Sequence, residues 1–347
     1  MHVFDYRFLK RDSVSSGILE RVVNIEGMRS RCECSPCPQS IKEALERRAI
    51  IMSVADSNAI ENIRTSEERL IGIVSNRVAP IGHDEEEIAG YRDALRYIHE
   101  NHGTMALSRD MILELYGILM KYSDRNPRGF KDRDNVIVGR TADGRIVKVH
   151  HTVPAAETEY CIEELIAAYW EARNDFGINK LLLIACFIQD FLCIHPFLDG
   201  NGRMSRLLTV LLLYQEGYDI CRYISMESMI NASRQDYYRA LEVSEEGWFE
   251  GTNDYAPFMS YFLSQIFLCY REYGIRMGEE MGRSSKSGSL RMFLRNSPMP
   301  ISKTDLSLMF PQLSVATVER VLGDMCDSGE IVMIGNHRSA RYVAARR

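Results

Sequence analysis

The sequence predicts a mainly α-helical protein with one β-hairpin and a small winged-helix domain at its C-terminal end. Apolar residues recur at helical spacing over most of the chain. Two alternating, β-branched runs, 135–139 and 145–150, flank a turn that contains Asp143-Gly144, which is a hairpin pattern. From residue 289 onward, three short helical patterns precede two β-like runs, the order of elements in a winged helix.

Helical patterns lie on both sides of the hairpin. Four helices are expected before it, at 39–62, 66–75, 84–102 and 108–121. Thr65 and Glu68 form a capping-box pattern at the start of the second one. Five more are expected after the hairpin, at 154–173, 178–193, 202–216, 226–246 (broken near Asn231–Ser233) and 254–280. These five are rich in Leu, Ile, Ala and Met, so we expect them to form the main core.

The C-terminal part of the chain has a composition of its own. The polar stretch Arg283 to Ser289 is expected to be a flexible linker. Beyond it we expect helices at 289–296, 303–309 and 314–328 and strands at 331–334 and 340–343, separated by a turn with Gly335-Asn336. Ser302 and Asp305 form a second capping box. From Ser285 onward nine Lys and Arg stand against five Asp and Glu, so this part carries +4 and the remainder −10. The expected division is an N-terminal helical region at 1–105, a central core at 106–282 and the winged-helix-like domain at 285–347.

The composition limits the class of protein. The chain has 347 residues, of which 46% are hydrophobic and 26% charged, which suffices for a sizeable core and more than one domain. A net charge of −6 argues against a general nucleic-acid or membrane-surface binder. The start of the chain has no apolar signal region, and the longest apolar runs are far short of the roughly 20 residues that span a bilayer. We expect a cytoplasmic protein with no membrane partner.

The cysteines agree with a reducing compartment. Six of the nine stand singly in apolar contexts, as small buried hydrophobes do. Cys32, Cys34 and Cys37 lie close together in RCECSPCP, but a zinc site needs a fourth ligand, and no nearby His or Cys pair supplies one. We expect an ordinary loop there, and the sequence leaves open whether these three residues bind a metal.

The segment from His195 to Arg206, HPFLDGNGRMSR, joins two helical patterns. The first ends before His195 because Pro196 disfavours helical geometry in the residue before it, and the second begins near Gly202. Two glycines and an asparagine between them let the backbone turn sharply and bring N–H groups close to a ligand. The free N–H groups at a helix N-terminus bind anions before any side chain contributes.

Side chains of the same segment add to that anion site. Arg203 and Arg206 are three residues apart and can reach two phosphates. Asp199 offers a hard carboxylate oxygen that suits Mg²⁺ shared with substrate phosphates, and His195 offers a base that titrates near neutral pH. Each residue alone has an ordinary structural explanation. Within twelve residues they together predict a phosphate-handling active site with ATP as the nucleotide.

At every defined position this segment resembles the signature His-x-Phe-x-(Asp/Glu)-Gly-Asn-Gly-Arg-x-x-Arg of Fic-domain proteins. The hairpin at 135–150 resembles the flap of that family, and Asn231–Leu241 resembles the stretch after its core helices, so the resemblance covers roughly 85–280. It implies a Fic-type helical bundle whose catalytic core is 106–282. It also implies a nucleotidyltransferase that moves AMP from ATP to a Ser, Thr or Tyr hydroxyl of a target protein and of itself.

The resemblance further implies a role for each residue of the signature. His195 would be the base that deprotonates the hydroxyl, Asp199 would bind Mg²⁺ between the α- and β-phosphates, and Phe197 would be a core anchor. Outside the signature, Tyr238 takes the place of an aromatic residue near the adenine. The residues expected to bind the phosphates are Gly200, Asn201 and Gly202 as the anion cradle, Arg203 at the α/β-phosphates and Arg206 at the γ-phosphate.

Upstream, Ser57-Asn58-Ala59-Ile60-Glu61-Asn62 resembles the inhibitory motif (Ser/Thr)-x-x-x-Glu-(Gly/Asn) of the same family. The resemblance implies that Glu61 contacts Arg206 and blocks productive binding of the γ-phosphate, with Ser57 as the first residue of the motif. By itself SNAIEN is an ordinary helix segment. Its coexistence with the signature favours the inhibitory interpretation.

Other functions also fit the sequence. The same fold could hydrolyse an AMP-modified target, with Glu61 positioning a water. A nucleotide-sensing regulator could instead bind DNA through the winged-helix-like domain, although such domains also bind proteins. The hairpin edge could hold a target segment by β-augmentation, or be purely structural. The sequence leaves open the target, the nucleotide base (CTP, GTP or UTP in place of ATP) and the oligomeric state, including a homodimer.

Overall fold

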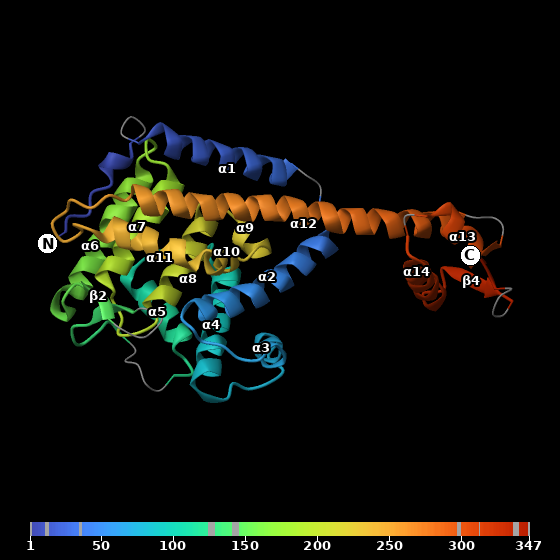
Figure 1. Ribbon diagram of the computed structural model, residues 1–347, viewed down its shortest axis with the longest axis horizontal. Coiled ribbons are helices and arrows are strands. Elements are labelled where there is room, and N and C mark those ends of the chain that lie inside the picture. The colour runs from blue at the N-terminus through green and yellow to red at the C-terminus, as the bar shows by residue number, and fades with distance from the viewer. Residues whose placement is uncertain are drawn as a thin grey trace. The chain divides into compact units, whose positions relative to one another are not determined.

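The computed structural model describes residues 2–10, 14–34, 37–123, 129–140, 146–296, 300–311, 313–335 and 340–345. These residues form two compact units, Met1–Tyr273 and Gly274–Arg347. Helices dominate and the sheets are small, so the predicted fold class is confirmed (Figure 1).

In the first unit, helices precede and follow one β-hairpin. Before it lie η1 (Arg7–Leu9), α1 (Ser16–Cys34), α2 (Gln39–Ile60), α3 (Glu67–Val74), α4 (Gly82–Asn101) and α5 (Arg109–Leu119). The hairpin pairs β1 (Val136–Arg140) with β2 (Ile146–His151) in antiparallel register. After it follow α6 (Ala155–Asn174), α7 (Lys180–Ile194), α8 (Asn201–Gln215), α9 (Ile220–Tyr223), α10 (Met226–Ala232), α11 (Arg234–Glu245) and α12 (Ala256–Asn296). The predicted break near Asn231–Ser233 is confirmed, because Ser233 separates α10 from α11.

The helices α7 and α8 form the centre of this unit. In α7 (KLLLIACFIQDFLCI) only Lys180 and Leu192 are not buried, and a helix that is apolar on all sides belongs in a core. α8 is buried from Arg203 to Tyr214. It contacts α2, α4, α5 and α7, and Figure 1 shows α7 and α8 in the interior of the unit. The turn between α7 and α8 is therefore held at both ends by the core.

The helices α4 and α5 approach each other very closely. A Cβ on Gly90 of α4 would lie 1.8 Å from the carbonyl oxygen of Leu119 at the end of α5. Any residue other than glycine would force the backbone apart, because interiors are packed without spare volume. The contact sets the position of α4, which also packs against α8.

Two local predictions are wrong. α3 is capped by Ser66, whose hydroxyl accepts the N–H of Arg69 at 3.3 Å, and not by Thr65, whose hydroxyl donates to Glu85. Cys32 and Cys34 lie in the last turn of α1 instead of a loop. The pattern of α1 is hard to recognise because the helix buries few of its residues: Ile18, Val22 and Ile25.

The second unit contains the end of α12, two short helices and a three-stranded antiparallel sheet of order β3-β5-β4. The elements are β3 (Ile301–Ser302), α13 (Lys303–Met309), α14 (Val315–Asp327), β4 (Ile331–Ile334) and β5 (Arg341–Ala344). The predicted order is present, with β3 as an additional strand. The capping box of Ser302 and Asp305 is also confirmed. The core consists of Leu290, Leu294, Leu306, Val318, Val321, Leu322, Met325 and Ile331.

The flexible linker expected at 283–289 is wrong, because these residues lie inside α12. The run has a single glycine, which costs a helix only about 1 kcal/mol. Beyond it, Leu290 and Leu294 are anchored in the core of the second unit, so the helix is held on the far side of the polar stretch. The boundary between the units falls between Tyr273 and Gly274. The division at 1–105, 106–282 and 285–347 stays a prediction.

The expected turn residues Asp143-Gly144 and Asn336 lie outside the described residues. Over the part of the chain that the structure describes, no helix is both long enough and apolar enough to span a bilayer.

Candidate active site

The predicted site lies in the turn that joins α7 to α8. His195 caps α7 in a left-handed conformation (φ 53°, ψ 62°), and its N–H donates to the carbonyl of Phe191 at 3.0 Å. A positive φ is uncommon outside glycine and stores strain, and such strain clusters at functional sites. Pro196 follows directly, so the helix end predicted from this proline is confirmed.

Asn201 holds the turn closed. Its amide oxygen accepts the N–H of Phe197 at 2.9 Å, and its amide nitrogen donates to the carbonyl of Phe197 at 2.7 Å. Phe197 is fully buried and stacks on Tyr116, with 3.7 Å between the ring centroids. Gly200, just before α8, has a φ of 80°, which glycine adopts without strain. The Asn201 side chain therefore shapes the turn, and its backbone N–H is the part available to an anion cradle.

The start of α8 faces the carboxylate of Glu61. Because α8 begins at Asn201, the N–H groups of its first turn have no acceptor within the helix. A Cβ on Gly202 would lie only 2.3 Å from Oε1 of Glu61, so glycine alone leaves room for the carboxylate. Glu61 thus occupies the place at which the helix N-terminus would bind an anion.

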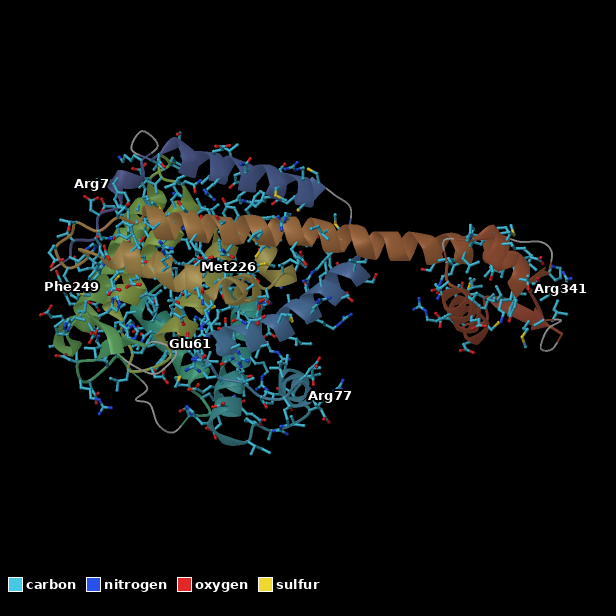
Figure 2. The ribbon with its side chains drawn as sticks, viewed as in Figure 1. Arg7, Glu61, Arg77, Met226, Phe249 and Arg341 are labelled. Atoms are coloured by element: carbon cyan, nitrogen blue, oxygen red, sulfur yellow. The ribbon has the colours of Figure 1, made fainter. Side chains whose placement is uncertain are left out.

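The same carboxylate contacts Arg206. Glu61 is the C-cap of α2 and is labelled in Figure 2. Its Oε1 accepts a hydrogen bond from Nη2 of Arg206 at 2.9 Å. Ser57 lies one turn earlier in α2. Its hydroxyl accepts a hydrogen bond from Nε of Arg206, and its carbonyl accepts one from Nη2, both at 2.9 Å. Arg206 is buried, and its Nη1 has no partner among the described residues. The structure therefore brings Ser57, Glu61 and Arg206 together, as the sequence pattern predicts.

Arg203 is fully buried and faces Glu87 of α4. Its Nη2 lies 3.2 Å from Oε1 of Glu87 and 3.7 Å from Oδ2 of Asp199. Burial raises the pKa of Glu87, and Arg203 is the main group that opposes this change. Nε and Nη1 of Arg203 have no partner in the described part of the chain, so two donors remain for a ligand. Glu87 is a site residue that the sequence pattern does not reveal, since it lies in an acidic run that resembles an ordinary solvated helix face.

Asp199 is the one residue of the signature with a largely exposed side chain, at 54%. Its Oδ1 accepts the N–H of Gly200 at 2.6 Å, and its Oδ2 lies 3.7 Å from Nη2 of Arg203. Among the described residues no cluster of three or more metal-ligating side chains is found. A single hard carboxylate fits Mg²⁺ that takes its other ligands from water and substrate phosphates, so the donor set suits an ion that binds together with a nucleotide.

The surroundings of His195 keep its imidazole neutral. Desolvation lowers the pKa of His195 to about 4, and the positive charge of Lys131 acts in the same direction. The carbonyl of Leu192 and the charges of Glu61 and Asp199 oppose this change. The imidazole is therefore uncharged at pH 7, the state in which it can accept a proton. Lys131 is the second neighbour of the site that the sequence pattern does not reveal.

Tyr238 lies on α11 near the C-terminal end of α2. Its hydroxyl donates to the carbonyl of Ile60 at 3.4 Å, and its side chain is partly exposed. The Arg234 guanidinium lies 5.7 Å from the centre of its ring. Burial, followed by the nearby Glu61 charge, raises the pKa of Tyr238 to about 12. The ring thus lies beside the residue that precedes Glu61, with part of its surface exposed.

Comparisons with known proteins agree with this geometry. Residues 106–213, which contain the α7–α8 turn, match the model of the Fic/DOC family. The chain is 27% identical over 224 residues to a protein adenylyltransferase Fic from Aedes aegypti, covering 62% of this chain and 40% of that protein. It is 25% identical over 236 residues to one from Nematostella vectensis, covering 65% and 48%. The chain thus spans less than half the length of these relatives.

Solved structures show the same fold. A Fic family protein from Desulfovibrio desulfuricans G20 superimposes with a TM-score of 0.64 at 20% identity, covering 96% of this chain and 97% of that one. A Fic-domain signaling protein from Bacteroides thetaiotaomicron VPI-5482 superimposes with a TM-score of 0.61 at 20% identity, covering 77% and 97%. The fold and the turn define a helical protein of the Fic type. The chain carries a domain of the Fic/DOC family.

Proposed function

We propose that this protein is a nucleotidyltransferase that moves AMP from ATP to a Ser, Thr or Tyr hydroxyl of a target protein and of itself. The observation that carries the proposal is the set of groups at the start of α8: a neutral His195, free N–H groups, and two buried arginines with unused donors. Such groups place and neutralise phosphates beside a base, as phosphoryl-type transfer requires. The name of the curated relatives, protein adenylyltransferase Fic, supports the same activity.

In the proposed reaction His195 accepts the proton of the target hydroxyl while the hydroxyl oxygen attacks the α-phosphorus of ATP. The new O–P bond forms as the bond from the α-phosphorus to the bridging oxygen breaks, and pyrophosphate leaves. Arg203 and the N–H groups of Gly200, Asn201 and Gly202 hold the α- and β-phosphates. Asp199 would hold Mg²⁺ together with phosphate oxygens, and the ion would supply charge neutralisation when bound.

The remaining nucleotide contacts follow from the neighbouring helices. Arg206 would hold the γ-phosphate, and Tyr238 would stack near the adenine. The hairpin offers a place for the target, because β1 pairs with β2 and with no other described strand. A target segment that adds to the free edge of β1 would bind through its backbone, which places few demands on its sequence.

Glu61 would inhibit this reaction by occupying two phosphate sites at once. Its carboxylate takes a donor of Arg206 and covers the backbone at Gly202. A nucleotide must displace it from both positions before the γ-phosphate can bind. Ser57 would support the inhibited state by fixing the Arg206 guanidinium at the orientation that Glu61 requires.

Labelling with α-labelled ATP and Mg²⁺ tests the proposal, with wild type compared with Glu61→Gly. We expect label on the protein itself, with more in the variant. Asn62→Gly is the matched control, because Asn62 has a φ of 65° at the same helix end and bonds to Arg234 rather than Arg206. Absence of label from all three proteins, with any of the four nucleoside triphosphates, would reject transferase activity.

The reverse reaction is a second candidate on the same groups, with Glu61 positioning a water for hydrolysis of an AMP-modified target. Its test is to add unlabelled wild type to purified, labelled Glu61→Gly and to follow release of AMP. Release that depends on Glu61 of the added protein would favour hydrolysis over transfer.

For the second unit we propose contact with a protein rather than with DNA. The exposed side chains of α14 include three carboxylates, Glu319, Asp324 and Asp327, against one cation, Arg320. A helix that enters the major groove needs a basic surface, because phosphate contacts supply much of the affinity. Salt-dependent binding of the full chain to duplex DNA would overturn this proposal. A homodimer and a cytoplasmic location also stay proposals, which sedimentation and cell fractionation can test.

A further inference from the structure

Lys131 is a buried cation beside the catalytic turn. It is 3% exposed, and its ammonium donates to three uncharged oxygens: Oδ1 of Asn135 at 3.0 Å, Oγ1 of Thr152 at 2.9 Å and the carbonyl of Ile194 at 3.1 Å. In the described part of the chain no carboxylate lies within ion-pair distance of it. Burial of such a charge is unfavourable and lowers the pKa of Lys131 to about 8. The charge of Asp134 acts in the opposite direction without lying within ion-pair distance, so the ammonium is held in the interior mainly by the three oxygens.

Lys131 contacts the chain on both sides of His195. Its ammonium bonds to the carbonyl of Ile194, the residue before His195. Its backbone N–H donates to the carbonyl of Pro196, the residue after His195, at 2.8 Å. Because His195 has a strained backbone, these two bonds hold the strain in place from either side.

The other partners of Lys131 lie at the base of the hairpin. Asn135 directly precedes β1 and Thr152 directly follows β2. The Thr152 hydroxyl is within 2.6 Å of Oδ1 of Asn135, and the Asn135 amide nitrogen donates to the carbonyl of Phe197 at 3.0 Å. One lysine therefore connects both strands of the hairpin to the turn that carries the base.

The charge of Lys131 has a clear electrostatic task. Among the described residues, the charges that act most on the pKa of His195 are those of Lys131, which favours the neutral imidazole, and of Glu61 and Asp199, which favour the protonated one. The phosphates of a bound nucleotide would add further negative charge and also favour protonation. A fixed cation next to the turn offsets these anions, so that the imidazole stays free to accept a proton.

We propose that Lys131 is a positioning residue whose buried ammonium fixes the His195 turn to the base of the hairpin and whose charge adds to the burial that favours the neutral imidazole. The inference rests on the proposed function, because a neutral His195 matters only if His195 acts as a base. The test of the inference does not depend on the proposed function, since the protonation state of an imidazole can be measured without turnover.

The experiment is a histidine NMR titration of the full chain, with the His195 signal assigned by its absence in His195→Gln. Lys131→Gln keeps a hydrogen-bond donor and removes the charge, whereas Lys131→Arg keeps the charge. Lys180→Met is the matched control, because Lys180 also bonds to backbone carbonyls, at the opposite end of α7. We expect the pKa of His195 to rise by about 1 pH unit in Lys131→Gln, the order of effect of one neighbouring charge, and to stay unchanged in Lys131→Arg and Lys180→Met.

Asn135→Asp provides a second test if Lys131→Gln does not fold. It replaces a partner of the ammonium with a carboxylate, which offsets the charge of Lys131 within the site and also removes the Asn135 hydrogen bond to the Phe197 carbonyl. The pKa of His195 should rise here as well. An unchanged His195 titration in every folded variant that lacks or neutralises the charge overturns the inference.

A rate measurement separates the inference from the proposed function. In the Glu61→Gly background, the acid limb of self-labelling should move to higher pH in Lys131→Gln by the same amount as the NMR titration. If Lys131→Gln lowers the rate of self-labelling but leaves the acid limb of its pH dependence unchanged, Lys131 has a structural role only. If the parent protein labels nothing at all, the proposed function fails, while the NMR result stands by itself.

Discussion

The Glu61 carboxylate lies 2.9 Å from Nη2 of Arg206, although the two residues are 145 positions apart. The contact joins the end of α2 to the first turns of α8 and lies directly over Gly202. Arg206 can satisfy a carboxylate or a phosphate, since both are arrays of oxygens that accept its fork of donors. The contact therefore occupies the groups that the proposed reaction needs for the γ-phosphate.

Glu61→Gly should raise self-labelling by about 10- to 100-fold. In the wild type a nucleotide competes with a tethered carboxylate, whose effective concentration is of millimolar order or above. A nucleotide that binds beside it is displaced from in-line geometry, and an error of about 1 Å can cost roughly 10²-fold in rate. Quantitative labelling at saturating ATP measures the gain.

The gain should disappear in Glu61→Gly, Arg206→Ala, because the arginine that the first change frees is then absent. Asn62→Gly should label like wild type, since it loosens the same helix end without removing the carboxylate. Equal labelling by wild type and Glu61→Gly would reject autoinhibition and return SNAIEN to an ordinary helix end.

The sequence reveals those parts of the site that lie close together in the chain. His195 and Asp199 lie in the turn before α8 and Arg203 and Arg206 in its first two turns, so their spacing within twelve residues already brings them close together. Glu87 is different: it reaches Arg203 across 116 positions, and the packing of α4 against α5 and α8 places it there. A packing distance of this kind leaves no periodic signal in the sequence.

The sequence also reveals helices best where their apolar pattern is strong. α7 is recognisable because nearly every residue is apolar and buried. α12 is not recognisable over its full length, because its polar run resembles a linker and the core that anchors its far end, at Leu290 and Leu294, forms only in three dimensions. Asn201 shows the same limit, since its type suggests a ligand contact and its surroundings direct its side chain to Phe197.

His195→Ala should abolish self-labelling in the Glu61→Gly background while nucleotide binding stays within a few-fold. A general base contributes typically 10²–10⁴-fold, because the hydroxyl is a poor nucleophile until its proton is removed. Single-turnover labelling and calorimetric titration with ATP measure the two effects separately. His102→Ala at the end of α4 is the control. Labelling by His195→Ala at the parental rate would exclude His195 as the base.

Asp199→Ala should remove most of the dependence of labelling on Mg²⁺, together with most of the activity. Asp199 is the exposed carboxylate of the turn, and Mg²⁺ bound with phosphates keeps few protein ligands. A titration of labelling with Mg²⁺ measures the change. Asp132→Ala, which removes an exposed carboxylate near the hairpin, should titrate like the parent. A normal Mg²⁺ midpoint in Asp199→Ala contradicts the metal role.

The stability of the protein should fall between about pH 6.5 and pH 4, in part through His99. Burial, followed by the Arg222 charge, lowers the pKa of His99 from 6.5 to about 4. The folded state therefore holds a neutral imidazole while the unfolded chain binds a proton. The stabilisation is complete above pH 6.5 and is lost as the pH falls toward 4, by an amount of order 1–3 kcal/mol. His99→Gln should flatten this part of a plot of unfolding free energy against pH, and a slope equal to that of wild type contradicts the assignment.

Asn201→Asp should lower both stability and transfer rate, because only an amide can serve both groups of Phe197. The carboxylate of the variant can still accept the Phe197 N–H but has no N–H to donate to the Phe197 carbonyl. One carboxylate oxygen would then face the carbonyl oxygen of Phe197 in the protein interior, with no hydrogen between them. An unsatisfied buried acceptor costs about 1–3 kcal/mol.

Asn58→Asp is the matched control in the Glu61→Gly background, since Asn58 is equally buried and donates to the carbonyl of Val54. Both variants should unfold at lower denaturant concentration. Labelling by folded protein should fall by about 10²-fold only in Asn201→Asp, because that residue holds His195 and the N-terminus of α8 in register. Equal labelling rates in the two folded variants would mean that the Asn201 side chain stabilises the turn without positioning the base.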